Sequence, residues 1–240
     1  MTLVKHSCIN TATVLRYSVN MVVPDFERAR SDEAKTLRER SILDAARRLG
    51  EARGIREITL TDIADEIGMH KSALLRYFET REQIFLRLTA TEWEQWSPEL
   101  RTALLDGAAP TPTRIAREFA RTLAARPLLC DLLAHTPLNL ERHVSMESVR
   151  DFKLVTHREV DAIIATLCEL LPGLTSQQAL DVIATATSMA GAQWQMANPG
   201  PEAAALYRSD PRLAHAIVDL EPRLARVLRA LVEGFLTERS

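Results

Sequence analysis

The stretch from residue 59 to 78 most constrains the fold, because it places two short helical patterns on either side of a glycine. Thr59-Leu60-Thr61-Asp62 has the spacing of a helix-capping box, with Asp in place of Glu or Gln, and it opens a short apolar segment. Gly68 interrupts that segment. The pattern resumes at Lys71, where Leu74 and Phe78 lie four residues apart and can face one core. Two short helices joined by a tight glycine-containing turn predict a helix-turn-helix.

The rest of the chain also favours helices. Alanine and leucine supply 32 and 33 of the 240 residues, whereas glycine and proline supply only 8 and 11. Ala and Leu have high helix propensity, and scarce Gly and Pro mean few turns. The apolar fraction of 46% excludes a disordered chain, and 3 cysteines exclude a disulfide scaffold. These features predict an all-α fold.

The spacing of apolar residues and prolines predicts the domain organisation. A helical pattern begins at Leu37, and a fourth helix is expected over residues 81–96. Pro98 and the proline-containing stretch 106–112 mark the expected domain joint. We therefore expect a flexible lead-in over residues 1–36, a helix-turn-helix domain over 37–97 and a larger helical domain over 98–240. Met21 is an alternative start, which would make residues 1–20 dispensable. The helices expected beyond the joint span 113–125, 127–135, 145–171, 175–197, 201–208 and 221–238.

The second helix of the motif is short and polar at its start, which suits entry into the major groove of DNA. Lys71, Ser72 and Arg76 supply donors that can reach base edges. Tyr77 and Arg81 are expected at phosphates, and the first helix is expected to meet the backbone through its first turn. His70 caps the second helix, contacts phosphate or is simply exposed. The residues predicted to contact DNA are Thr59, Thr61, His70, Lys71, Ser72, Ala73, Arg76, Tyr77 and Arg81.

Residues 38–88 resemble the DNA-binding domain of the TetR family of bacterial transcriptional regulators. The matching pieces are Ile42-Leu43-Asp44-Ala45-Ala46, Thr59, Asp62-Ile63-Ala64, Gly68, Lys71, Leu74, Tyr77-Phe78 and Arg81-Glu82. Residues 130–153 are similar to one C-terminal subclass of that family. The chain departs from the family pattern at His70, Leu75 and Arg76, so the base preference of a relative does not transfer. The resemblance implies an all-helical homodimer that binds operator DNA and holds an effector ligand in its C-terminal domain.

The C-terminal half contains aromatic and histidine residues that can line a ligand pocket between helices. Each of them can equally belong to an ordinary core. No metal-binding spacing, nucleophile motif or dinucleotide-binding glycine loop occurs, so we expect no metal, no cofactor and no enzymatic activity. The candidate ligand-binding residues are Phe119, His135, Phe152, His157 and Trp194.

Three widely spaced cysteines, Cys8, Cys130 and Cys168, are expected to be reduced thiols. No apolar run reaches the roughly 18 residues that span a bilayer. Arg16 interrupts any signal-peptide core near the N-terminus. The sequence therefore predicts a cytoplasmic protein without a membrane partner.

Two helices are predicted to form a dimer interface. The helix at 221–238 carries an apolar stripe of Leu224, Leu228, Leu231 and Phe235. The helix at 175–197 carries the small residues Ala184, Ala186, Ala190 and Gly191, which allow close approach of another helix. A core within one chain is the alternative for both helices. The leading hypothesis is a TetR-like repressor that a small molecule releases from DNA. The alternatives are a helical enzyme and a DNA-binding protein without a ligand response.

Overall fold

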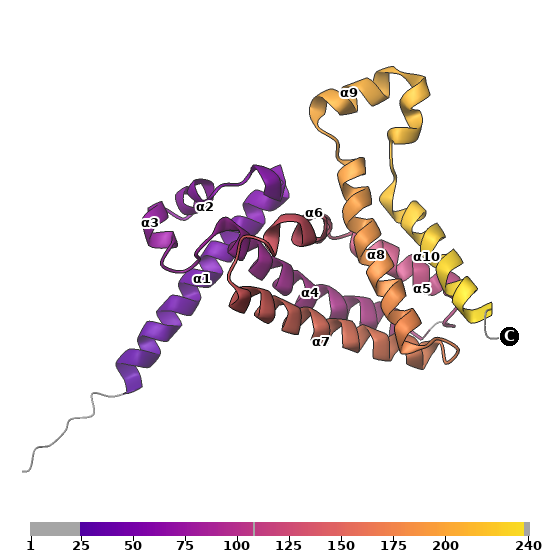
Figure 1. Ribbon diagram of the computed structural model, residues 1–240, viewed down its shortest axis with the longest axis horizontal. Helices are drawn as coiled ribbons and strands as arrows, with labels where there is room; N and C mark the ends of the chain where they lie inside the picture. The colour runs from indigo at the N-terminus through magenta and orange to yellow at the C-terminus, as the bar shows by residue number, and fades with distance from the viewer. Residues whose placement is uncertain (1–24, 108, 238–240) are drawn as a thin grey trace, which may run out of the picture.

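The computed structural model describes residues 25–107 and 109–237, and these residues form helices joined by turns and loops (Figure 1). No β-strand occurs in these ranges, so the all-α prediction is confirmed. The proposed leader, residues 1–20, lies outside the described residues. The N-terminal elements are α1 (Asp25–Arg53), the 3₁₀ turn η1 (Ile55–Glu57), α2 (Leu60–Glu66), α3 (Lys71–Leu74) and α4 (Arg81–Leu105). The remaining elements are α5 (Pro112–Ala124), α6 (Pro127–His135), the π-helical segment η2 (Thr136–Leu140), α7 (Met146–Leu170), α8 (Ser176–Ala197), α9 (Pro201–Ser209), the 3₁₀ segment η3 (Pro211–Ala216) and α10 (Leu220–Thr237).

The first helix is longer than the sequence pattern indicated. Residues 25–36, which were expected to belong to a flexible lead-in, form the first turns of α1. A nucleated helix lengthens at little cost where neither Gly nor Pro intervenes. Lys35 and Glu39 also form an i,i+4 ion pair with 4.0 Å between Nζ and Oε1. The apolar stripe that identified the helix therefore marks only the part of α1 that packs on other elements.

Thr or Ser caps the N-terminus of most of the longer helices. Side-chain oxygens of Thr80, Thr111, Ser145 and Thr175 accept hydrogen bonds from the backbone N–H three residues on, at the starts of α4, α5, α7 and α8. Prolines occupy the first positions of α5, α6 and α9, where the missing N–H is not needed. These local signals explain why most boundaries could be placed from the sequence.

Helix α4 runs past the predicted domain joint. The expected boundary at 97/98 falls inside this helix, which continues through Pro98 to Leu105. The helix continues because its buried stripe does: Trp96 and Leu104 are both fully buried. Trp96 stacks edge-on against Phe119 of α5, with 6.1 Å between ring centroids, and its indole N–H donates to Thr122 Oγ1 at 3.0 Å. Helix α4 is thus one rigid element shared by the helix-turn-helix and the body.

The body is built from α4 to α8 and α10. Helices α4 and α7 run parallel (Figure 1). Gln83 Nε2 donates to Ser148 Oγ at 2.9 Å, and Arg101 Nε donates to Thr166 Oγ1 at 3.2 Å. The two hydrogen bonds are 18 residues apart on each helix and follow in the same order, which fixes the parallel direction. Helix α6 approaches α8 so closely that a Cβ on Gly191 would lie 2.8 Å from the backbone N of Ala134. Gly191 therefore serves packing within one chain.

Part of the predicted dimer stripe also belongs to this core. Leu224, Leu228 and Val232 of α10 are fully buried, in a helix that packs on α5 and α8. On α8, Ala186 and Ala190 are fully buried as well. These positions are buried because other helices of the same chain pack on them. The spacing of apolar residues predicts a buried face but not which helix covers it.

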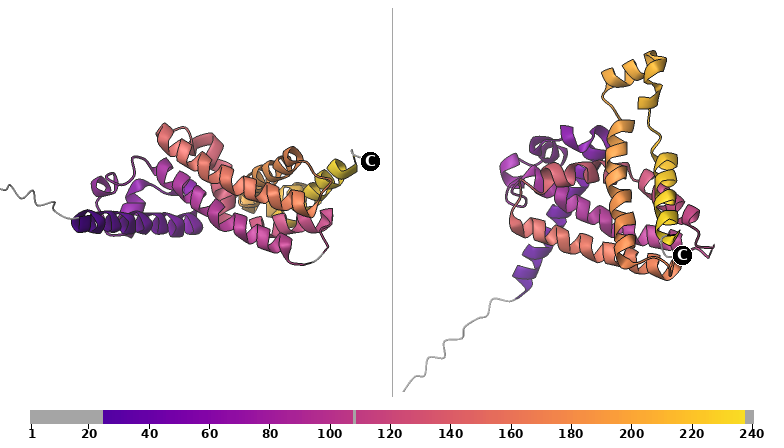
Figure 2. Two further views of the ribbon diagram at one scale, coloured as in Figure 1. Left: turned by 90° about the horizontal axis from the view of Figure 1, so that it is seen from below. Right: turned by 45° about the vertical axis from the view of Figure 1, so that its right-hand side comes forward.

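Helix α9 and segment η3 form an excursion between α8 and α10 that stands away from the body (Figures 1 and 2). No residue of α9 is buried. Among the described residues, no helix combines the length and apolar character needed to cross a membrane.

Candidate nucleic-acid interface

Helix α2 begins with the capping box expected from the sequence. Thr59 Oγ1 accepts from Asp62 N at 3.2 Å, and Asp62 Oδ2 accepts from Thr59 N at 2.8 Å. The Thr59 hydroxyl also donates to Asp62 Oδ2 at 2.5 Å, and this hydrogen bond is the main reason that the pKa of Asp62 is lowered. Thr59 is exposed, but its side chain is engaged in the cap. Thr61, two residues on, is exposed without such a role.

A left-handed turn at Gly68 joins α2 to α3. Gly68 has a φ of 64°, which L residues with a side chain rarely adopt. Helix α3 is shorter than the expected 71–78, because it ends at Leu74 and the chain continues in tight turns to Phe78. Leu74 and Phe78 are both buried, so they anchor α3 in the core as the sequence predicted.

The outward surface of α3 and of the turn after it is mostly polar, although Leu75 is also exposed. His70, Lys71, Ser72 and Arg76 are exposed, whereas Ala73 and Tyr77 are half-buried. His70 occupies the N-cap position, but its side chain makes no capping hydrogen bond. Within the described part of the chain, the salt bridges include neither Lys71 nor Arg76. These two cations are free to meet an external anion or a base edge.

Arg81, which was predicted at a phosphate, is engaged inside the protein. Its guanidinium donates to the backbone carbonyls of Ile55 and Ile58, and to Glu82 at 2.9 Å. The same group lies 5.0 Å from the ring centroid of Phe85. Arg81 therefore ties η1 to the start of α4 and holds the helix-turn-helix on the long helix.

Asp131 connects the helix-turn-helix to the body. This carboxylate of α6 is only 7% exposed; Oδ2 accepts from Ile55 N at 2.8 Å and Oδ1 accepts from Gln195 Nε2 at 2.7 Å. His135, one turn on, lies 3.4 Å from Oδ1 through Nδ1. Burial raises the pKa of Asp131, but hydrogen bonds from His135, Ile55 and Gln195 outweigh burial and lower it. Asp131 thus joins η1, α6 and α8 at one point.

A second buried carboxylate makes a similar connection. Glu92 of α4 is 2% exposed and pairs with Arg47 of α1 and with Arg126, whose Nη1 lies 3.2 Å from Oε2. Arg126 precedes α6 and also pairs with Glu99 at 2.7 Å. A buried carboxylate between two guanidinium groups is well compensated, and loss of either partner would leave charge unpaired. Glu92 therefore fixes α1 against α4 and the α5–α6 corner.

The predicted ligand-binding residues do not come together in one place. Phe119 is fully buried beside Trp96, and His135 pairs with Asp131. His157 is on the surface, where its Nδ1 lies 2.9 Å from Asp161 Oδ2. Phe152 lines a cleft beside α1, and Trp194 is half-buried on α8. Among the described residues, no cluster of three His, Cys, Asp or Glu side chains could hold a metal ion.

The roles of Asp131 and Glu92 were not predicted from the sequence. The available signal was an acidic residue within an apolar helical pattern, as in Leu129-Cys130-Asp131-Leu132. A buried carboxylate requires partners, so such a residue predicts a polar contact but not its identity.

Comparisons with known proteins identify the family. Residues 42–88 match the model for bacterial regulatory proteins of the tetR family, and residues 90–239 match the tetracyclin repressor-like C-terminal domain. No curated protein matches the chain. The fatty acid degradation regulator FadR from Bacillus halodurans is 16% identical, with a TM-score of 0.51 over 82% of this chain and 96% of that one.

Two further solved structures are similar at lower TM-scores. Thermus thermophilus FadR, a TetR family repressor in complex with lauroyl-CoA, is 21% identical, with a TM-score of 0.47 over 82% of this chain and 94% of that one. A TetR/AcrR family regulator from Thermobifida fusca is 19% identical, with a TM-score of 0.46 over 80% and 96%. The two family models together extend from the helix-turn-helix to the last helix. The chain belongs to the TetR family of transcriptional regulators.

Proposed function

We propose that this regulator is a homodimeric repressor that binds operator DNA through α3 and is released by a small-molecule ligand. The observation that carries the proposal is the outward surface formed by α3 and the turn after it, where Lys71, Ser72 and Arg76 are exposed while Leu74 anchors the opposite side. A guanidinium or ammonium group can donate to guanine N7 and O6 in the major groove. We assign base contacts to Lys71, Ser72 and Arg76, with Ala73 close to the groove floor.

The remaining predicted contacts are assigned by their surroundings. We propose phosphate contacts for Thr61, which is exposed on α2, for His70, which precedes α3, and for Tyr77, which follows it. Thr59 acts through the cap of α2, since its hydroxyl already bonds to Asp62. Arg81 acts as a positioning residue, since it bonds to Ile55 and Ile58 within the protein.

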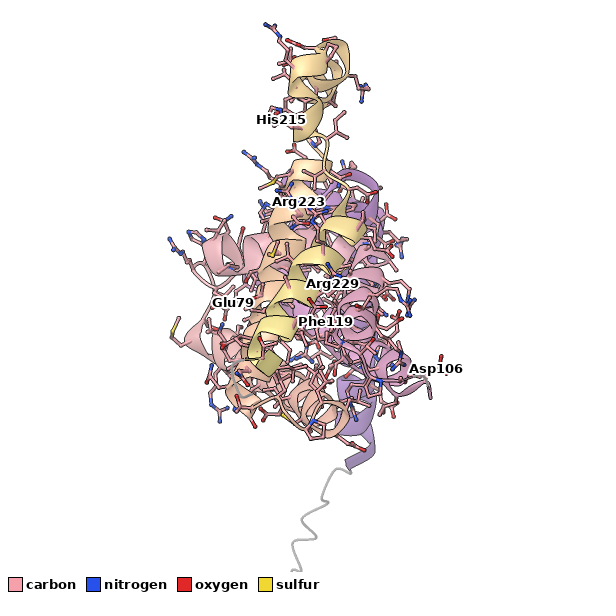
Figure 3. The ribbon with its side chains drawn as sticks, turned by 90° about the vertical axis from the view of Figure 1, so that its right-hand side faces the viewer. Glu79, Asp106, Phe119, His215, Arg223 and Arg229 are labelled. Carbon is pink, nitrogen blue, oxygen red and sulfur yellow. The ribbon has the colours of Figure 1, made fainter. Side chains whose placement is uncertain are left out.

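Dimerisation is proposed through the outward sides of α8 and α10, which pack side by side within the chain. Small residues are exposed on both helices: Ala184, Ser188 and Ala192 on α8, and Ala230 and Gly234 on α10. Figure 3 shows Arg223 and Arg229 along the face of α10 that points to the viewer. Two copies of this helix pair would form a four-helix interface about a two-fold axis, the commonest oligomer symmetry.

A ligand response requires that the ligand prefer one arrangement of the two α3 helices over another. Asp131 and Glu92 are two of the groups that connect the helix-turn-helix to α6 and α4. We propose that a change in α6 or α4 reaches α3 through these two carboxylates.

A mobility-shift assay on the region upstream of the protein's own gene tests the DNA-binding function. We expect a shift at moderate salt that Lys71→Ala/Arg76→Ala weakens, since both side chains are exposed and their removal should leave the fold intact. Arg142→Ala removes an exposed arginine elsewhere and serves as the matched control. Equal binding by the double variant and the control would contradict the role of α3.

Light scattering tests the dimer. Charges at Ala184 and Ala230 should give a folded monomer, because both positions are exposed. Ala165→Glu on the exposed side of α7 is the control and should remain dimeric. A dimer that persists in the Ala184→Glu/Ala230→Glu variant would rule out this interface.

A further inference from the structure

A cleft separates the helix-turn-helix from the N-terminal part of α7. It has a volume of about 350 Å³ and is bounded by α1, by the turns that follow α3, by the first turns of α4 and by the start of α7. At one end Gln83 Nε2 donates to Ser148 Oγ at 2.9 Å, which holds α4 to α7. The volume lies at the lower end of the range for small-molecule sites.

The floor of this cleft is apolar. Phe78, Leu86, Ala90 and Phe152 line it, and each of these residues is buried. They come from the turn after α3, from α4 and from α7, so the floor can accept the flat face of a ring or a short alkyl chain. Burial of that part of a ligand would supply a favourable hydrophobic contribution.

The rim of the cleft is charged, and its cations are not neutralised. Arg40 of α1 and Arg87 of α4 are exposed, and neither guanidinium is engaged in a salt bridge within the described part of the chain. Of the acidic residues on the rim, Glu39 pairs with Lys35 at 4.0 Å, which leaves Asp151 of α7 as the counter-charge. The rim therefore carries a surplus of positive charge, which favours an anionic group on a ligand.

We propose that this cleft binds a small amphipathic anion, with an aromatic or short alkyl body on the apolar floor and one carboxylate, sulfonate or phosphate at Arg40 and Arg87. The cleft is bounded by the helix-turn-helix on one side and by α7 on the other, so an occupant fixes their relative position. Ligand binding is the first step of this proposal. In the second step, which rests on the proposed repressor function, an occupied cleft changes the affinity of the chain for operator DNA.

The binding step is tested without DNA by isothermal titration calorimetry. Naphthalene-1-sulfonate is the probe, and 1-naphthylmethylammonium has the same ring system with the opposite charge. We expect one sulfonate per chain and weaker binding of the ammonium. Arg40→Glu/Arg87→Glu should weaken sulfonate binding about tenfold or more, because two charge-assisted contacts are replaced by repulsion.

The matched control is Arg142→Glu/Arg208→Glu, which makes the same change in net charge at exposed positions outside the cleft. It should bind the sulfonate within about twofold of the wild type, since distant surface charges are screened by salt. Equal losses in both double variants, preference for the ammonium or no sulfonate binding by the wild type would each overturn the proposal.

The regulatory step is tested on the upstream DNA fragment. Saturating sulfonate should change the DNA affinity of the wild type, and this change should be smaller in an Arg87→Ala variant at the same sulfonate concentration. An unchanged DNA affinity at saturation would overturn the regulatory step. If the wild type binds the sulfonate but no DNA, the repressor function fails and the binding site stands, so the two failures are distinguishable.

Discussion

Asp131→Ala should destabilise the chain more than the same replacement of an aspartate on the surface, because Asp131 is buried. Oδ2 of this carboxylate is the acceptor for the backbone N–H of Ile55, at 2.8 Å in a buried position. In Asp131→Ala this backbone donor keeps its place and loses its partner. Of the other two donors, Gln195 is exposed and can turn to water, and His135 is half-buried with partial access to water.

The size of the effect follows mainly from the hydrogen bond of Ile55 N to Asp131. A hydrogen bond to a charged group contributes about 1.5–3 kcal/mol, and the bond from Ile55 N is the one that water cannot replace. We expect the free energy of unfolding to fall by about 2 kcal/mol, which for a chain of this size lowers Tm by about 4–8 °C. Asp131→Asn keeps one acceptor for Ile55 N, so its effect should be smaller than that of Asp131→Ala.

Thermal unfolding followed by circular dichroism measures this effect, and hydrogen exchange at the Ile55 amide locates it. The control is Asp161→Ala, because Asp161 and His157 form the same kind of i,i+4 pair on the surface, with the side chain of Asp161 60% exposed. Asp161→Ala should change the free energy of unfolding by less than about 0.5 kcal/mol. Equal Tm losses in the two alanine variants, or unchanged exchange at Ile55, would refute the role of Asp131.

Single side chains support three further predictions. The hydrogen bond to Asp131 is the main cause that raises the pKa of His135 above its ordinary 6.5. The protonated imidazole should therefore add its full stability below pH 6.5, and this stability should disappear as the pH rises through the raised pKa. The difference in free energy of unfolding between wild type and His135→Gln should shrink from about pH 6 to pH 9. Burial raises the pKa of the Cys130 thiol to about 12. A Cys8→Ser/Cys168→Ser variant keeps Cys130 as its one thiol, so it should react with Ellman's reagent only after unfolding. Reaction of the folded variant would contradict this burial. Arg76→Ala should weaken operator binding by about 1–3 kcal/mol and relax the sequence preference at one base pair. Arg81→Ala should lower Tm and leave the salt dependence of DNA binding unchanged. A flatter salt dependence for Arg81→Ala would instead indicate that Arg81 contacts a phosphate.

The parts of the structure that local chemistry determines were predictable from the sequence. The capping box of Thr59 and Asp62, the turn at Gly68 and the buried pair Leu74 and Phe78 are set by neighbours within four residues. Such features depend on backbone geometry and spacing, which a single sequence contains.

Features that depend on distant partners could not be read in the same way. Leu228 has the spacing of an interface residue, and only its position in a helix that packs on α5 and α8 makes it core. Arg81 has the sequence position of a phosphate contact, but the carbonyls of Ile55 and Ile58 lie within its reach. Asp131 bonds to Ile55, 76 residues away, and no local pattern indicates that pair.

In vitro selection of genomic DNA fragments by the 240-residue chain tests operator binding by a symmetric dimer, because the selection itself reveals the operator sequence. A dimer that presents two copies of α3 about a two-fold axis should enrich an inverted repeat whose half-sites lie about one helical turn, or roughly 10 base pairs, apart. The Lys71→Ala/Arg76→Ala variant should lose this enrichment. Selection that yields no common sequence, or a single half-site without its inverted copy, would contradict operator binding by a symmetric dimer.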